Sequence, residues 1–273
     1  MYCEHWQLKR RPFDDYAPEA FYYPGESHQG ALLKLRYALE TRQPAALLVG
    51  PPGVGKTRLV HTLLGRLPAS FAPRVHAVFP QMPPTQLLAY LADDISEEPR
   101  GESAPSIEHS VRRIQRSLAE NSRQGRHAVV VVDEAQILDE TGALEWMRLL
   151  LNVEGEGGPP LTLLLTGQPG LVPALERFPS LEERLGVKCM MRPFTPDETA
   201  AYVAHRLQAA GAKQVIFDDA ALDALYRLSH GSPRRINRLA DLALLIGYAE
   251  QLAQIGAAQV EDVCSELVAV APE

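Results

Sequence analysis

The stretch of sequence that decides the fold is Ala45-Ala-Leu-Leu-Val49, which runs directly into Gly50-Pro-Pro-Gly53-Val-Gly55-Lys56-Thr57. Five consecutive apolar residues predict a strand that is buried on both faces, and Lys56 begins a helical pattern that extends to Leu67. The loop between strand and helix matches the complete pattern GxxxxGK(S/T). A Gly/Pro-rich turn that merely contains a lysine is the alternative, and the strand and helix on either side argue against it.

The residue types of this loop suit a phosphate group. Glycines allow backbone N–H groups to turn inward around a β-phosphate, at a helix N-terminus whose dipole favours anions. Lys56 is expected to reach the β- and γ-phosphates of ATP, and the Thr57 hydroxyl is expected to ligate Mg²⁺. The predicted nucleotide-binding residues of the loop are Gly50, Pro51, Pro52, Gly53, Val54, Gly55, Lys56 and Thr57.

A second signal is the run Ala128-Val-Val-Val-Val132 followed by Asp133-Glu134. Four consecutive valines predict a central strand, and a carboxylate at its C-terminal end faces the crevice where ligands bind in such sheets. Asp133 is expected to hold Mg²⁺, and Glu134 is expected to act as a general base toward the attacking water. The alternative is an Asp-Glu pair that only caps a helix. Together with the phosphate loop, the pair favours hydrolysis over transfer to an acceptor.

Short apolar runs and helical patterns alternate as far as Met191. Further strands are predicted at Val75–Phe79, Leu161–Leu165 and Val187–Met191, with helices between them, including one over Thr141–Val153. This alternation predicts a doubly wound α/β fold with a parallel sheet.

Beyond Met191 the strand signal stops. Thr195-Pro-Asp-Glu198 reads as a capping box with proline at the first helical position, and only helical patterns follow it. We therefore predict an α/β domain over residues 1–192 and a helical domain over residues 193–273.

Composition and charge restrict the class of protein. The 273 residues include 27 Lys+Arg against 34 Asp+Glu, a formal net charge of −7, which argues against a general nucleic-acid coat protein. Three widely spaced cysteines exclude a disulfide scaffold and fit a reducing, cytoplasmic location. No signal peptide is expected at the start of the chain. The longest uncharged stretch, residues 157–175, contains four Gly and four Pro, so no transmembrane segment is expected either.

Taken together, these motifs resemble the AAA+ ATPases, and within them the ATPases of the general secretion pathway A (ExeA) type and the related pilus-biogenesis ATPase MshM. The likeness covers nearly the whole chain and includes Trp6-Gln-Leu8, Leu165-Thr-Gly-Gln-Pro169, Glu183-Arg-Leu185 and Gly231-Ser-Pro-Arg234. It implies a three-layer α/β/α domain whose five-stranded parallel sheet has the order 5-1-4-3-2, plus a small all-helical lid. Secretion proteins of this type continue into a membrane helix and a peptidoglycan-binding region. This chain stops at Glu273, so we expect an excised ATPase module or a stand-alone cytoplasmic member.

The resemblance implies further residues around the nucleotide. Gln168 matches the sensor-1 position, with Thr166 as the second choice, and the alternative is that Gln168 only satisfies backbone groups of its loop. Arg234 matches the sensor-2 arginine of the lid, which contacts the γ-phosphate. The aromatic residues Phe13, Tyr22 and Tyr23 either pack on the adenine, as the resemblance implies, or belong to the core.

Arg184 matches the family's arginine finger, which reaches the nucleotide of a neighbouring subunit. Arg177 is the competing candidate for this role. The plainer alternative for Arg184 is a local ion pair with Glu182 or Glu183.

The predicted function is an ATP-hydrolysing switch or motor that uses ATP and Mg²⁺, forms a homo-oligomer (a ring or filament, hexamer-like) when loaded, and acts on an unknown protein client. One alternative is an ATP-dependent DNA-binding regulator of transposition resembling MuB and TniB. Another is a scaffold that binds ATP with little turnover. A basic stripe of Arg112, Arg113 and Arg116 is interpreted as a solvated helix face rather than as a track for DNA phosphates.

Overall fold

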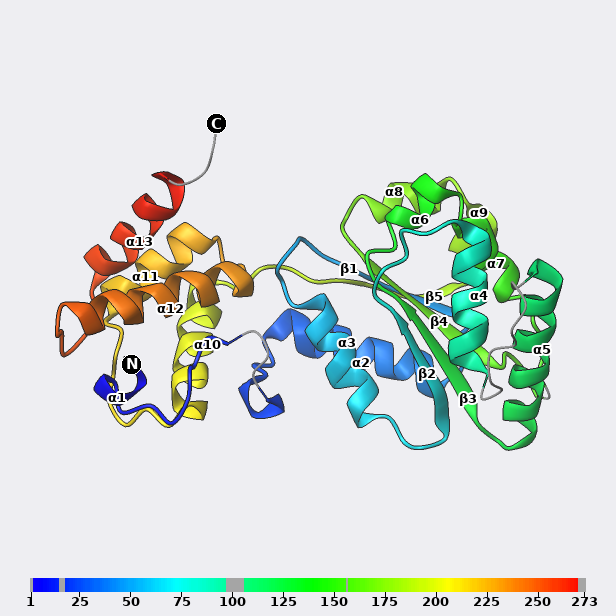
Figure 1. Cartoon of the computed structure of the whole chain (residues 1–273), viewed down its shortest axis with the longest axis horizontal. Coiled ribbons are helices and arrows are strands. Elements are labelled where there is room, and N and C mark those ends of the chain that lie inside the picture. The colour runs from blue at the N-terminus through cyan, green and yellow to red at the C-terminus, as the bar shows by residue number, and fades with distance from the viewer. Residues whose placement is uncertain (1, 15–17, 97–105, 156, 270–273) are drawn as a thin grey trace. The chain divides into compact units, whose positions relative to one another are not determined.

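The apolar runs of the sequence pair into one parallel sheet in the order β2-β3-β4-β1-β5 (Figure 1). The computed structural model describes residues 2–14, 18–96, 106–155 and 157–269, and within them the strands are β1 (Ala45–Val49), β2 (Phe71–Ala77), β3 (His127–Val132), β4 (Leu161–Gly167) and β5 (Leu185–Met190). Counted from the other edge, this is the order 5-1-4-3-2, so the predicted five-stranded α/β fold is confirmed. Because β3, β4 and β1 are parallel neighbours, the segments that follow them start side by side at one edge of the sheet.

Helices cover both faces of this sheet. On one face, Val130 and Val132 of β3 share a core with apolar residues of α4 (Pro84–Ile95) and α5 (Ile107–Arg123). The intervening side chains Val129 and Val131 are also fully buried, and they point to the opposite face because successive residues of a strand alternate. On that side of the strands lie α2 (Glu26–Glu40) and α3 (Lys56–Arg66), as Figure 1 shows.

Two predicted elements differ from the structure. The single helix predicted over Thr141–Val153 is two helices, α6 (Ile137–Thr141) and α7 (Leu144–Leu150), because Gly142 at φ +72° ends α6 in the left-handed conformation. The strand predicted at Val75–Phe79 starts and ends earlier. Its pairing with β3 stops at Ala77, opposite Val132, and the next two residues are exposed. Two short helices precede β5, and they are α8 (Leu171–Glu176) and α9 (Pro179–Glu182).

The described residues group into two units. The sheet unit contains residues 27–51 and 56–191, and the helical unit contains residues 2–26, 52–55 and 192–269. The expected division assigned residues 1–192 to the α/β domain; in the structure the N-terminal segment and the tip of the phosphate loop group with the helical residues instead. None of the helices in the described ranges combines the length and the apolar character needed to span a bilayer.

The N-terminal segment belongs to the helical unit because its aromatic and carbonyl groups are bound there. Trp6 is 1% exposed, and its indole Nε1 donates to the Leu244 carbonyl at 3.0 Å. The buried Arg206 guanidinium donates from Nε to the Pro12 carbonyl and from Nη2 to the Asp14 carbonyl, both at 2.6 Å. The helices of this unit are α1 (Tyr2–His5), the 3₁₀ turn η1 (Glu19–Phe21), α10 (Pro196–Ala209), α11 (Asp219–Ser229), α12 (Pro233–Ala249) and α13 (Ala257–Ala269).

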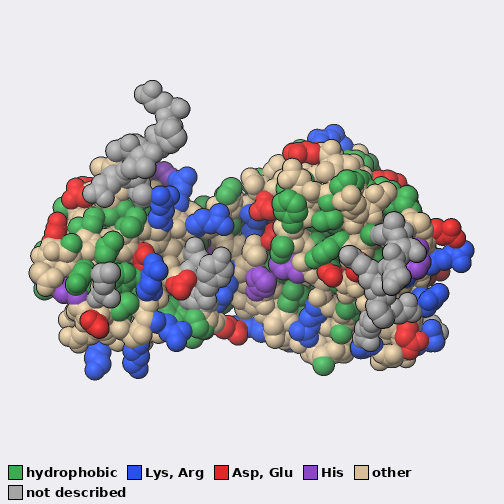
Figure 2. Space-filling model, in the orientation of Figure 1, with side chains coloured by type: hydrophobic (Ala, Val, Ile, Leu, Met, Phe, Trp, Pro, Cys, Tyr) green, Lys and Arg blue, Asp and Glu red, His purple; other side chains and the backbone are tan. Residues whose placement is uncertain are grey.

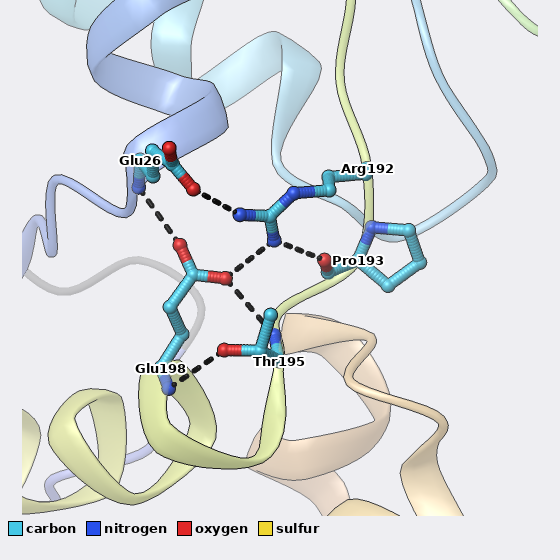
Figure 3. Close-up of polar contacts among 5 residues, drawn as sticks. All are labelled: Glu26, Arg192, Pro193, Thr195 and Glu198. Carbon is cyan, nitrogen blue, oxygen red and sulfur yellow. Dashed lines mark hydrogen bonds and ion pairs between the residues drawn. The ribbon is translucent and has the colours of Figure 1, made fainter.

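The predicted capping box opens α10. The Thr195 hydroxyl accepts from the Glu198 amide at 3.2 Å, and the Glu198 carboxylate accepts from the Thr195 amide at 2.9 Å. Arg192 donates to this carboxylate at 2.5 Å and to Glu26 at 2.6 Å, and Glu198 also accepts from the Glu26 amide at 2.8 Å (Figure 3). Glu26 is the last residue of the helical unit's N-terminal stretch and Arg192 is the first residue of its C-terminal stretch, so this cluster joins the ends of these two stretches.

Candidate nucleotide-binding site

The phosphate loop connects the end of β1 to the start of α3. Gly50 donates its amide to the Gly167 carbonyl at 3.2 Å, which attaches the loop to the end of β4. Gly53 and Gly55 adopt positive φ values of 78° and 97°, conformations that turn the backbone and that favour glycine. Lys56 is 5% exposed, and its Nζ donates to the carbonyl of Gly50 at 2.8 Å, inside the curve of the loop. The loop therefore places a buried ammonium at a helix N-terminus, which is a site for an anion.

The tip of the loop is in contact with the start of α12. The Arg234 amide donates to the Gly53 carbonyl at 3.2 Å. A Cβ atom at Gly53 would lie 2.8 Å from the Ser232 Oγ and 3.0 Å from the Arg234 Cβ. Within the helical unit, Gly53 is therefore required both for its backbone conformation and for this close approach. The Arg234 side chain is exposed beside the tip.

Asp133 follows β3 and lies beside Thr57. The Thr57 hydroxyl donates to Asp133 Oδ2 at 2.6 Å, and the buried Thr166 hydroxyl donates to Oδ1. Burial alone would raise the pKa of Asp133, but the His76 imidazole, 3.8 Å away, and hydrogen bonds from Thr166, Thr57 and the Glu134 amide outweigh burial and hold this pKa well below its usual range. Asp133 is therefore ionised near neutral pH, beside the phosphate loop.

The oxygen donors of this pair fit Mg²⁺. Mg²⁺ takes hydroxyl and carboxylate oxygens together with water and substrate phosphates, and it rarely has a site built from protein groups alone. Thr57 and Asp133 supply one hydroxyl and one carboxylate next to the loop that would hold the phosphates. Among the described side chains, no three His, Cys, Asp or Glu residues are arranged to hold a metal ion by themselves.

Glu134 lies in a strained turn after β3 and is bound by two amide side chains. Its φ of 49° is in the left-handed region, which a non-glycine residue rarely adopts. Its Oε2 accepts from Gln136 Nε2 at 2.6 Å and from Gln168 Nε2 at 3.4 Å. Gln136 also accepts from the Gln168 amide at 3.0 Å through Oε1. The structure thus brings Gln168 to Glu134, whereas Thr166 contacts Asp133.

Sequence reasoning missed two of these neighbours. Gln136 stands two positions after Glu134 in the run Asp133-Glu-Ala-Gln136, so a polar residue that close to a candidate base was a usable signal. His76 lies within β2, and a strand histidine gives no such signal because only the pairing of β2 with β3 brings it to Asp133.

The two finger candidates both have partners within the sheet unit. Arg184 donates to Asn152 Oδ1 at 2.7 Å rather than to Glu182 or Glu183, so the local ion pair is not what is found there. Arg177, which is 60% exposed, forms an ion pair with Asp139 at 2.5 Å. Both guanidinium groups lie on the segment between β4 and β5, as expected from the sequence.

The structure favours one of the two alternatives for Phe13 and corrects the interpretation of Arg113. Phe13 is 4% exposed and meets Phe217 edge-to-face in the core of the helical unit. Arg113 is also buried, and it donates to Asp93 at 2.6 Å, so it is not part of a solvated basic face. Arg112 is exposed and pairs with Glu108 one turn away, as that interpretation expected.

Comparison with known proteins gives consistent matches. The family model described as "AAA domain" matches residues 39–175. The General secretion pathway protein A of Aeromonas hydrophila is 34% identical over 251 residues, covering 91% of this chain and 45% of that protein. This chain thus spans less than half the length of that relative.

Solved structures agree on the fold. The ORC2 protein of Aeropyrum pernix, solved as ADPNP and ADP complexes, superposes with a TM-score of 0.72 at 18% identity, covering 97% of this chain and 73% of that one. The Drosophila ORC bound to DNA gives a TM-score of 0.71 at 15% identity, covering 97% of this chain and 66% of that one.

Proposed function

The chain belongs to the AAA domain family, and from that premise we propose that it is an ATP hydrolase whose site is built from the phosphate loop and the segments after β3 and β4. The observation that carries the proposal is the pair of adjacent carboxylates, Asp133 and Glu134, which have different surroundings. Both oxygens of Asp133 accept hydrogen bonds from hydroxyl groups, those of Thr57 and Thr166. Glu134 instead accepts from side-chain amides, through one of its two oxygens. Two neighbouring carboxylates with distinct environments suit distinct roles.

In this proposal each residue has one task. Lys56 and the amides of the loop bind the β- and γ-phosphates of ATP. Thr57 and Asp133 hold Mg²⁺, which neutralises phosphate charge when it is bound. Glu134 accepts a proton from the water that attacks the γ-phosphorus, while the bond to the β–γ bridging oxygen breaks and ADP and phosphate form. Gln168 orients that water.

Two arginines extend the proposal beyond this core of the site. Arg234, beside the tip of the loop, responds to the γ-phosphate. Arg184 reaches the nucleotide of a neighbouring copy, so that hydrolysis requires an ATP-bound homo-oligomer. We further propose that the ATPase acts in the cytoplasm and remodels or assembles a protein partner; the similarity to a protein named for the general secretion pathway supports a role in secretion.

The DNA-binding alternative has less support from this chain. Arg113 is buried against Asp93, which removes it from the basic stripe. On the face drawn in Figure 2, Lys and Arg side chains are interspersed with Asp and Glu rather than gathered into one track. DNA phosphates are bound by an accumulation of positive charge, so salt-dependent binding to duplex DNA is the result that would favour this alternative.

The experiment that tests the proposal compares two variants. Lys56→Ala should abolish ATP binding or weaken it severely in calorimetry, because the phosphate site loses its point charge. Glu134→Gln should still bind ATP while turnover falls by roughly two or more orders of magnitude, because the base is removed at constant size. Glu176→Gln, at the exposed end of α8, is the matched control and should keep full turnover. Unchanged turnover in Glu134→Gln would instead favour another base, and tight binding without turnover in the unsubstituted protein would favour the scaffold.

A further inference from the structure

The Gln136 side chain bridges the two segments that carry the candidate base and the candidate sensor. Its Nε2 donates to Glu134 Oε2 at 2.6 Å, and its Oε1 accepts from the backbone amide of Gln168 at 3.0 Å. The first contact fixes a carboxylate, and the second fixes the segment after β4. One amide side chain therefore uses its donor on one segment and its acceptor on the other.

The surroundings leave little freedom for this bridge. A Cβ atom at Gly167 would lie 2.7 Å from Gln136 Oε1, so the chain after β4 approaches Gln136 as closely as glycine permits. Glu134 adopts its left-handed φ of 49° at the other end of the bridge. Such a conformation costs free energy and persists where neighbouring groups fix it, and it is concentrated at functional sites.

The bridge distinguishes the two oxygens of the Glu134 carboxylate. Oε2 accepts both from Gln136 and, at 3.4 Å, from Gln168 Nε2. A carboxylate that acts as a base needs one oxygen oriented toward the water whose proton it takes. With Oε2 bound by amide donors, the orientation of Oε1 is set as well.

We propose that Gln136 is a positioning residue for ATP hydrolysis, which binds Glu134 through Oε2 so that Oε1 is presented to the attacking water, and which couples that orientation to the segment carrying Gln168. This inference rests on the proposed hydrolase function. Gln136 itself touches neither nucleotide nor water in this role; it acts through Glu134.

The two halves of the side chain can be separated by substitution. Gln136→Glu keeps an acceptor for the Gln168 amide but loses the donor to Glu134 and places two carboxylates together. Gln136→Leu removes both contacts at similar size. Gln86→Glu, on the exposed face of α4, is the matched control for the added charge. In the full chain, both Gln136 variants should lower kcat by about tenfold to a hundredfold, as loss of an orienting hydrogen bond does, while KM and ATP affinity stay within about twofold of those of the unsubstituted protein.

A double substitution provides the readout that a merely structural role would not give. In single-turnover measurements, Gln136→Leu added to Glu134→Gln should cause no further loss of rate, because the residue acts through the base that is already absent. Multiplying rate losses in the double variant would overturn the proposal, and so would a Gln136→Glu variant with unchanged kcat, because Gln136 would then only support the segment after β4. Failure of the hydrolase proposal gives a different result, since the unsubstituted protein would then lack turnover while retaining its fold.

Discussion

Two pairs of buried polar side chains, one pair in each unit, are bound by different kinds of group. In the sheet unit, the buried Asp133 accepts hydrogen bonds from the hydroxyls of Thr166 and Thr57 at the C-terminal ends of the strands. In the helical unit, the buried Arg206 and Trp6 donate to backbone carbonyls of segments far away in the sequence. Burial alone therefore does not mark a site. The sheet-unit pair is bound by neighbouring side chains, whereas the helical-unit pair ties distant chain segments together through their carbonyls.

Substitution of Arg184 has the largest expected effect. It tests whether ATP hydrolysis depends only on residues at the ends of β1, β3 and β4 or also on the segment between β4 and β5. Arg184→Ala should lower turnover by about 10³–10⁵-fold, because a finger neutralises charge that develops on the transferred phosphoryl group. The interactions that Arg184 would give up are two hydrogen bonds to uncharged groups, the Asn152 side chain and the Arg148 carbonyl, which are weak compared with that gain. Steady-state ATPase assays on the single variant measure this loss.

Mixing experiments then establish which subunit the guanidinium serves. An Arg184→Ala protomer keeps its own Glu134 and can borrow a finger from a Glu134→Gln neighbour, so a mixture of the two inactive variants should regain activity. If Arg184→Ala alone retains full turnover, the finger is not Arg184, and Arg177→Ala is the next variant to measure. If co-assembled mixtures stay inactive, Arg184 acts within its own subunit or the assembly hydrolyses ATP only as a whole.

Substitution of Trp6 has the next largest expected effect. It tests whether buried donors of the helical unit stabilise the fold by binding distant carbonyls. Trp6→Ala should lower the free energy of unfolding by about 3–5 kcal/mol, because a fully buried indole and its hydrogen bond to Leu244 are lost. Denaturant unfolding followed by circular dichroism measures this change. Tyr37→Ala, at a side chain that is 57% exposed, should change stability little. Equal losses in the two variants would contradict the assignment of Trp6 to the core.

The sequence allowed the sheet edge to be predicted, but not the attachments of the helical unit. Lys56, Thr57 and Asp133 are fixed by local patterns, since a strand end and a glycine-rich loop position them whatever the rest of the chain does. Trp6 and Arg206 donate to backbone carbonyls. Because every residue has a carbonyl, the residue types in the sequence do not indicate which ones accept. The structure groups the N-terminal segment with the helical unit, which the sequence gives no means to predict, whereas the strand order was predicted correctly.

His127 is a buried polar group of the sheet unit that lies away from the candidate site. Burial first, and the charge of Arg42 second, lower its pKa to about 4, and its Nε2 is 2.9 Å from the Thr162 hydroxyl. The unfolded chain, with a histidine pKa near 6.5, binds more protons between those two values, so stability should fall by about 2–3 kcal/mol as the pH decreases from about 6.5 to 4. Unfolding free energies across this pH range measure the slope. His127→Gln should flatten it, and His109→Gln, on the exposed face of α5, should leave it unchanged.

The smallest expected effect concerns the cluster of Glu26, Arg192 and Glu198 in Figure 3. Burial would raise the pKa of Glu198, but Arg192 and the amides of Thr195 and Glu26 outweigh burial and lower it. A carboxyl group with a lowered pKa in the folded state stabilises the protein above its ordinary pKa, and this contribution is lost as the pH falls through the folded-state value. Glu198→Gln should therefore cost about 1 kcal/mol at neutral pH and progressively less in acid.

Two controls separate this cluster from ordinary surface charge. Glu26 bonds to the same guanidinium but is 86% exposed, against 13% for the Glu198 side chain, so Glu26→Gln should cost less than Glu198→Gln. Glu261→Gln removes an exposed ion pair with Arg227 in the same unit and should cost almost nothing. A pH-independent cost for Glu198→Gln would mean that the capping contacts to Thr195, rather than the charge on Arg192, hold the start of α10. Equal losses of unfolding free energy for all three substitutions would mean that the cluster stabilises the start of α10 no more than a surface ion pair does. The helical unit would then be held together by its buried donors alone.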